Sequence, residues 1–66
     1  MPIKVYEGRF GYEQFLFDLN SDFYNIPLKD EFIFWQDTVY KVLYNMSDLD
    51  NNVECVFVRK AIEEDY

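Results

Sequence analysis

Residues 38–46 read TVYKVLYNM and residues 53–60 read VECVFVRK, and these two stretches decide the fold. In the first, large apolar side chains recur at every second position, at Tyr40, Val42, Tyr44 and Met46. Successive side chains of a β-strand point to opposite faces of the sheet, so a period of two predicts a strand. We therefore expect these four side chains to share one face, with a more mixed set on the other.

The second stretch is apolar on both faces. Val53, Cys55 and Phe57 fall on one face, and Val56 and Val58 fall on the other. A strand with two apolar faces is typical of the middle of a sheet that is covered on both sides. Cys55 is then expected to be a core residue, since an unpaired cysteine behaves as a small hydrophobe.

The segments beside these stretches predict hairpins and a loose end. Residues 31–35 read EFIFW, and the pair at 36–37 fits a two-residue hairpin turn, although neither Gln nor Asp favours the positive φ that primed turns need. Residues 47–52 read SDLDNN, which is a turn cluster. Residues 61–66 are acidic, and we expect this tail to fray.

The first half of the chain is more ambiguous. Residues 3–10 predict a strand that ends near Gly8 or Gly11. Residues 12–19 fit both a strand and a helix, and we predict a strand because the segment is too short to nucleate a helix well. The whole chain, 1–66, is thus predicted to be one mostly β domain. Its architecture is a small antiparallel meander of about five strands, forming an open barrel or curled sheet of SH3-like or OB-like size. The alternative is an α+β fold with one helix near residues 11–20.

The net negative charge of the chain argues against some classes of binding partner. Its 66 residues include 13 acids and 6 bases, a net charge of −7. Such a surface repels nucleic-acid phosphates and anionic membranes and attracts basic partners. With the six bases scattered along the sequence, we predict no direct nucleic-acid binding and no membrane partner. The chain shows no signal-peptide pattern and no apolar run of membrane-spanning length, so the predicted localisation is cytoplasmic.

The sequence contains no recognisable motif for catalysis or metal binding. The chain has no histidine and one cysteine. Asp48, Asp50 and Asn52 have the spacing that opens an EF-hand loop, but Val53 replaces its glycine and Arg59 its final glutamate. We therefore interpret this segment as a turn and predict no metal, no cofactor, no catalytic residue and no enzymatic activity.

The aromatic residues carry the functional prediction. The 7 Phe, 6 Tyr and 1 Trp are more rings than so small a core is expected to hold, and exposed rings are typical of protein interfaces. The candidate binding residues are rings that flank turns and acids that lie near them: Phe23, Tyr24, Trp35, Asp30, Glu31 and Asp37.

Residues 26–34, which read IPLKDEFIF, and residues 39–44, which read VYKVLY, have a layout that resembles small phage and prophage proteins. In that layout an Ile-Pro segment leads through an acidic turn into a strand, followed by a Tyr-x-Val strand, an Asp/Asn turn and a last strand. Asp30 stands where the layout usually has a glycine. The resemblance spans residues 26–60 and implies a small β-domain of phage or mobile-element origin, active in the host cytoplasm, without assigning functional residues.

Three hypotheses follow. The first is a protein-binding module, an accessory protein that binds and modulates a host protein and that also forms a homodimer. The second is a nucleic-acid mimic that inhibits a DNA- or RNA-binding enzyme, so that its partner is a basic nucleic-acid-binding protein. The third is a structural or assembly subunit whose apolar surface is buried in an oligomer.

Overall fold

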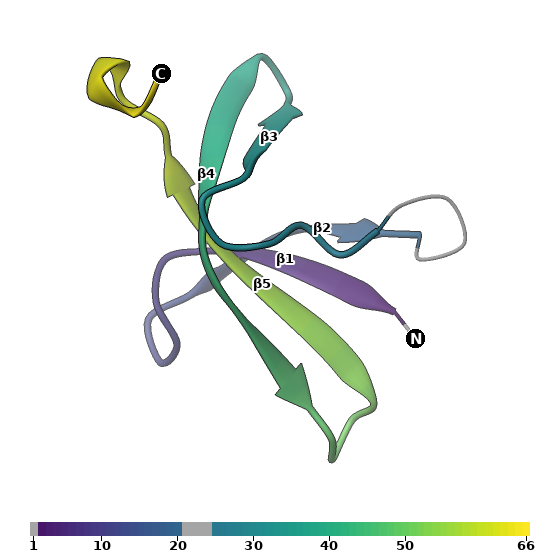
Figure 1. Ribbon diagram of the computed structural model, residues 1–66. Helices are drawn as coiled ribbons and strands as arrows, with labels where there is room; N and C mark the ends of the chain where they lie inside the picture. The colour runs from purple at the N-terminus through teal and green to yellow at the C-terminus, as the bar shows by residue number, and fades with distance from the viewer. Residues whose placement is uncertain (1, 21–24) are drawn as a thin grey trace.

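The computed structural model describes residues 2–20 and 25–66, which form a single curled sheet (Figure 1). Its elements are β1 (Ile3–Glu7), β2 (Gln14–Leu19), β3 (Phe32–Trp35), β4 (Thr38–Asp48), β5 (Val53–Lys60) and a short 3-10 turn, η1 (Glu63–Asp65). The predicted five-stranded curled β-sheet is confirmed as a half-barrel, and residues 14–19 are a strand rather than part of the alternative helix. Within the described ranges, no helix has the length and apolar character needed to cross a membrane.

The strands lie in the order β2-β1-β5-β4-β3, and the sheet is mixed. β1 runs parallel to β5, from Ile3 opposite Glu54 to Glu7 opposite Val58, and the other neighbours are antiparallel. The predicted antiparallel meander was therefore wrong at two places: β1 pairs with β5 in parallel, and β2 lies at the opposite edge of the sheet from β3. A buried strand must pair its backbone N–H and C=O groups along both edges, and β5 does so with β4 on one side and β1 on the other.

β5 separates two apolar clusters, as its sequence predicted. The inner cluster is made of Ile3, Val5, Tyr40, Val42, Val56 and Val58. The outer cluster is made of Val53, Cys55 and Phe57, with Tyr6, Tyr44 and Met46 packed against it. The inner cluster lies inside the curl, where Phe17 of β2 and Trp35 of β3 meet with their ring centroids 4.5 Å apart. The two outermost strands, β2 and β3, are thus in contact through their side chains.

A β-bulge in β4 corrects the predicted distribution of its side chains. Val42 pairs with Val58 and Tyr44 pairs with Phe57, so Leu43 is an extra residue in the strand. An extra residue reverses the alternation beyond it. Tyr40 and Val42 therefore lie in the inner cluster, whereas Tyr44 and Met46 lie against the outer one. The prediction that all four share one face was wrong.

The β3–β4 hairpin has the two-residue turn that the sequence predicted. Gln36 and Asp37 have φ values of 47° and 62°, so both central residues adopt the positive φ that a type I′ turn requires. Gln36 thus takes a conformation that its side chain does not favour, whereas Asp37 is of a residue type that tolerates positive φ. Pairing of Trp35 with Thr38 and of the residues beyond them holds the turn in place.

The double substitution Gln36→Asn with Asp37→Gly is expected to stabilise the protein by about 1 kcal/mol, because an Asn-Gly pair adopts positive φ at low cost. In a domain of this size, such a gain raises the melting temperature by roughly 4–8 °C. Thermal denaturation followed by circular dichroism measures it. Asp50→Gly, in a turn position without positive φ, is the control and should give no gain; a gain of the same size would contradict the turn assignment.

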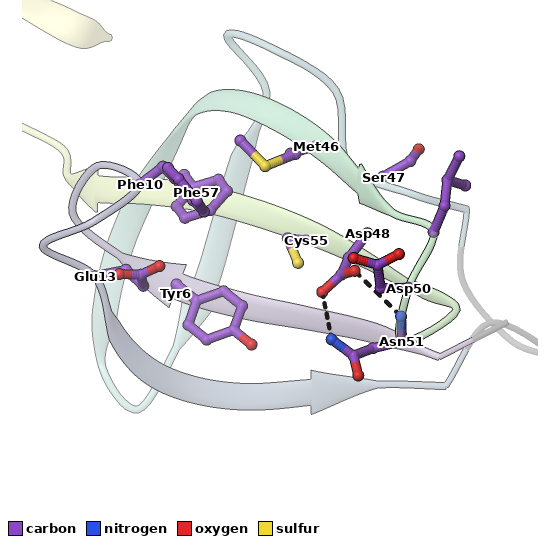
Figure 2. Close-up of a pocket in the computed structure, with 11 residues that line it drawn as sticks. Tyr6, Phe10, Glu13, Met46, Ser47, Asp48, Asp50, Asn51, Cys55 and Phe57 are labelled. Atoms are coloured by element: carbon purple, nitrogen blue, oxygen red, sulfur yellow. Dashed lines mark hydrogen bonds between the residues drawn. The ribbon is translucent and has the colours of Figure 1, made fainter.

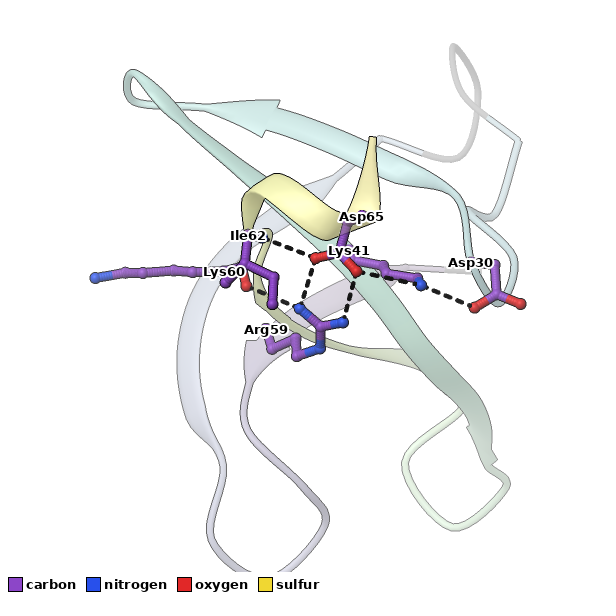
Figure 3. Close-up of polar contacts among 6 residues, drawn as sticks. All are labelled: Asp30, Lys41, Arg59, Lys60, Ile62 and Asp65. Carbon is purple, nitrogen blue, oxygen red and sulfur yellow. Dashed lines mark hydrogen bonds and ion pairs between the residues drawn. The ribbon is translucent and has the colours of Figure 1, made fainter.

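The tail over residues 61–66, for which the sequence predicts fraying, makes defined contacts with the sheet (Figure 3). The Arg59 guanidinium donates to both carboxylate oxygens of Asp65, at 2.8 and 2.9 Å, and the Ile62 N–H donates to the same carboxylate at 2.7 Å. The Lys41 ammonium lies 3.5 Å from Asp65. The ring of Tyr66 stacks on that of Phe32, with centroids 5.7 Å apart. Asp65 is thus the centre of an ion-pair network that joins the tail to β4 and β5.

The Asp65 contacts predict a pH-dependent stability. Hydrogen bonds from Arg59, followed by the bond from Ile62, hold the pKa of the Asp65 carboxyl well below its usual range. A carboxyl with a lowered folded-state pKa stabilises the fold above its unfolded pKa of about 3.9, and this contribution is lost as the pH falls through the folded value. Asp65→Asn is therefore expected to lower the melting temperature at pH 7, by a difference that shrinks as the pH falls below about 4. Glu64→Gln, in the same turn, should match the unaltered protein; a deficit of Asp65→Asn that is independent of pH would refute the assignment.

Candidate functional site

The outer face of the sheet carries a groove of about 550 Å³, which we call the trough (Figure 2). Its floor is formed by Tyr6 of β1, Cys55 and Phe57 of β5, and Met46 of β4. Phe10, from the β1–β2 loop, lies at one end, and the β4–β5 turn lies at the other. The trough exists because the bulge in β4 directs Met46 outward and because Cys55 and Phe57 occupy the outer face of the central strand.

A row of rings crosses four strands beside and beneath this trough. Tyr44 and Phe57 stack at 4.9 Å, Phe57 and Tyr6 stack at 5.7 Å, and Tyr6 meets Phe15 edge-on at 5.8 Å. Each of these pairs is also a register pair of neighbouring strands. Phe10 covers Phe57 edge-on at 6.3 Å, and its backbone N–H donates to the Tyr44 hydroxyl at 2.7 Å. Aromatic cross-strand pairs stabilise a sheet beyond their burial, so the row is a rigid surface.

The rim of the trough is acidic. Of the residues that the structure describes, three acids, Glu13, Asp48 and Asp50, line it, and no basic residue does. Asp48 accepts hydrogen bonds from the backbone N–H and side-chain amide of Asn51, at 3.2 and 2.9 Å. These bonds lower the pKa of the Asp48 carboxyl, so this acid is charged at neutral pH. The predicted turn is confirmed over residues 49–52, whereas Ser47 and Asp48 are the last residues of β4, and Asp48 and Asp50 border an aromatic groove.

The floor of the trough is uncharged at neutral pH. Burial raises the pKa of the Cys55 thiol, and the nearby carboxylates of Asp48 and Glu54 raise it further. Burial likewise raises the pKa of the Tyr6 hydroxyl. Cys55 is only 9% exposed, which confirms its predicted place in the core. A thiol in these surroundings is a poor nucleophile, because the reactive species is the thiolate.

A second pocket, of about 330 Å³, gathers basic residues on the outer side of the other end of the β4–β5 ladder. Arg9, Lys29, Lys41 and Arg59 line it, together with Asp30. These are four of the six basic residues of the chain, so bases that are scattered along the sequence are brought together by the fold. Lys41 lies between Asp30, at 3.6 Å, and the buried carboxylate of Asp65 (Figure 3). No local pattern signals this pocket, because its bases come from a loop, a turn and two strands.

The predicted rings lie elsewhere. Phe23 and Tyr24 fall outside the described residues. Trp35 is half-buried, packs against the inner cluster and contacts Phe17 and Tyr40. It also lines a groove of about 570 Å³ between β2 and β3. Trp35 is thus part of the seam that joins the edges of the half-barrel, and its removal is expected to destabilise the fold.

The predicted acids lie in two separate turns. Asp30 and Glu31 precede β3, where Glu31 accepts a hydrogen bond from the Leu28 N–H at 2.5 Å. Asp30 has a φ of 72°, a conformation that suits the glycine found at this place in the resembled layout. Asp37 lies in the β3–β4 turn. The described members of the predicted set therefore do not form one site.

Comparison with known proteins identifies no similar protein. The chain matches no protein-family model, and no curated protein or solved structure is significantly similar to it. Among residues 2–20 and 25–66, no three side chains of the metal-binding types His, Cys, Asp and Glu are grouped so that they could hold a metal ion. The trough and the basic pocket are accordingly interpreted from their chemistry alone.

Proposed function

We propose that the chain is a non-enzymatic protein-binding module and that it contacts its partner through the outer face of the sheet, at the trough. The observation that carries this proposal is the joining of an aromatic floor and an acidic rim in one groove. Rings supply most of the binding energy in many protein interfaces, and charged groups at the rim select and steer the partner. A partner with basic side chains beside an apolar one fits both parts of the groove.

The exposure of the surrounding rings supports this proposal. Phe10 is 62% exposed and Phe15 is 47% exposed, although both touch the row of rings. Lys4 lies over the Phe15 ring at 5.3 Å, so one cation–π contact already exists on this face. The resemblance of residues 26–60 to small phage proteins makes a bacterial host protein the partner to seek first, and modulation of that protein the proposed outcome.

The arrangement of the acids favours this module over a nucleic-acid mimic. A mimic needs carboxylates spaced along one stripe, like phosphates. Here Asp18 pairs with Lys4 on β2 and β1, Asp65 pairs with Arg59, and Asp37 lies in a distant hairpin. One observation supports the assembly-subunit alternative. On the edge strand β3, Phe34 is 70% exposed and Phe32 is 45% exposed. An apolar edge strand is a ready site for pairing with another chain.

Affinity capture tests the proposal. The tagged protein and its variants Phe10→Ser and Phe34→Ser are exposed to bacterial lysate and washed at about 50 and about 500 mM NaCl, and bound proteins are identified by mass spectrometry. Both substitutions remove an exposed ring, but only Phe10 lies at the trough. We expect a basic protein to be retained by the unaltered chain and by Phe34→Ser and to be lost from Phe10→Ser.

Equal capture by Phe10→Ser and by the unaltered chain would contradict the proposal. A partner that binds at low salt only would shift the account toward the mimic, since exposed charge–charge contacts are screened by salt. Recovery of the bait alone would support the assembly-subunit alternative. Circular dichroism of each variant confirms that the fold is retained.

A further inference from the structure

The outer face has opposite charges at its two ends. Along the β4–β5 ladder, the outward residues run from the Asp48–Val53 pair through Met46–Cys55 and Tyr44–Phe57 to Lys41–Arg59. Asp50 adds a second acid at the first end, and Arg9 and Lys29 add two bases at the last. From Val53 to Arg59 the ladder spans about 20 Å at the usual rise per residue. This exceeds the Debye length of about 8 Å in physiological salt, so each end acts on its own surroundings.

The middle of the face is apolar. Tyr44, Phe57 and Phe10 form it, and Phe10 stands out from the sheet with 62% of its surface exposed. The third acid of the trough, Glu13, lies on the β1–β2 side of this ladder. The face therefore runs from acid through rings to base, in one direction along the central strand.

We propose that a second copy of this chain binds this face, related to the first by a twofold axis near Phe10. A twofold axis across the face reverses the direction of the second ladder. The acidic end of each copy then meets the basic end of the other, and the rings meet at the centre. A twofold interface uses the same patch on both subunits, so the patch must complement itself, and a face with this charge order does.

The charges on this face favour a second copy of the chain over a basic segment of another protein. A basic segment would complement Asp48 and Asp50 but would meet Arg9 and Lys29, which have the same sign of charge, at the other end. Within residues 2–20 and 25–66, neither Arg9 nor Lys29 is in an ion pair, so both are available to an acidic surface. This inference rests on the proposed function, in that the outer face is a protein-binding surface, and it adds self-association through that face.

Charge-reversal mixing tests the dimer. Asp50→Lys places like charges at both contacts of its own dimer, and Arg9→Glu does the same with the opposite sign. Mixing the two variants restores opposite charges at both contacts. Asp37→Lys changes the net charge as much as Asp50→Lys does but lies in the β3–β4 turn, and it is the matched control. Sedimentation velocity from about 10 to about 500 µM measures the association constants.

We expect the unaltered chain and Asp37→Lys to dimerise within this range, and each of the other variants to associate at least about tenfold more weakly, a change that one or two close charge pairs produce. The equimolar mixture should recover to within about threefold. A monomer throughout the range, equal weakening by Asp37→Lys, or a mixture that does not recover would overturn the proposal. If Phe10→Ser loses lysate capture but the mixing test fails, the dimer proposal is overturned and the proposed function stands with a partner other than a second copy. If the mixed dimer is restored but lysate capture does not depend on Phe10, the dimer would be supported and binding of a host protein at the trough would be contradicted.

Discussion

Phe57→Ala is expected to remove about 3–5 kcal/mol of stability, the usual cost of truncating a buried phenylalanine to alanine. Phe57 is 1% exposed, and its ring contacts those of Tyr6, Tyr44 and Phe10, which come from two neighbouring strands and a loop. The free energy of unfolding of a native protein is only about 5–15 kcal/mol, so the variant should be largely unfolded under mild denaturing conditions.

The matched control is Phe34→Ala, which removes the same ring from a site that is 70% exposed. It is expected to change the stability by less than about 1 kcal/mol. Urea denaturation followed by circular dichroism compares the two. Similar losses for both variants would mean that the outer face is not a second core, and the structure of the trough would have to be abandoned.

Deleting Asn45 is expected to cost at least about 3 kcal/mol, because one residue less reverses the faces of the strand beyond it and puts either Tyr44 or Met46 on the wrong side. Deleting Leu43 is expected to do much less. Leu43 is the extra residue of the bulge, so its removal leaves Val42 inside and Tyr44 outside in a regular strand. Without a bulge, the two deletions would be equally damaging.

A point substitution separates the loss of the residue from the loss of register. The Asn45 amide donates to the Pro27 carbonyl at 2.7 Å, and Asn45→Ala removes only this bond. Its expected cost is about 1 kcal/mol. Urea denaturation of the three variants should rank the deletion of Asn45 well above the other two in lost stability. A variant without Leu43 that is as unstable as the one without Asn45 would refute the bulge.

The comparison of β5 with β4 explains how far the sequence predicts this fold. In β5 the alternation of Val53, Cys55 and Phe57 against Val56 and Val58 is uninterrupted, and the central strand was predicted correctly. In β4 the same reasoning failed at Leu43, because a bulge adds a residue without changing the local pattern. A second bulge at Leu16 of β2 lies at a neighbouring position of the sheet, and both increase its twist.

The candidate site was less predictable than the fold. The aromatic excess and the acidic turn at residues 47–52 were visible in the sequence, but their joining in one trough depends on the bulge. The basic pocket needs Arg9, Lys29, Lys41 and Arg59 to meet from four segments, which only the strand order achieves. The parallel pairing of β1 with β5 was missed for the same reason, since no turn sequence connects them.

The central claim is that the bulge directs Tyr44 to the outer face, where it builds the row of rings beside the trough. The nuclear Overhauser effects of the Tyr44 ring protons in the folded, unaltered protein test it most directly. The account predicts contacts from Tyr44 to the Phe57 ring and the Phe10 amide. Contacts from Tyr44 to the methyl groups of Val42 and Val56, with none to Phe57, would place this ring in the inner cluster and contradict the account.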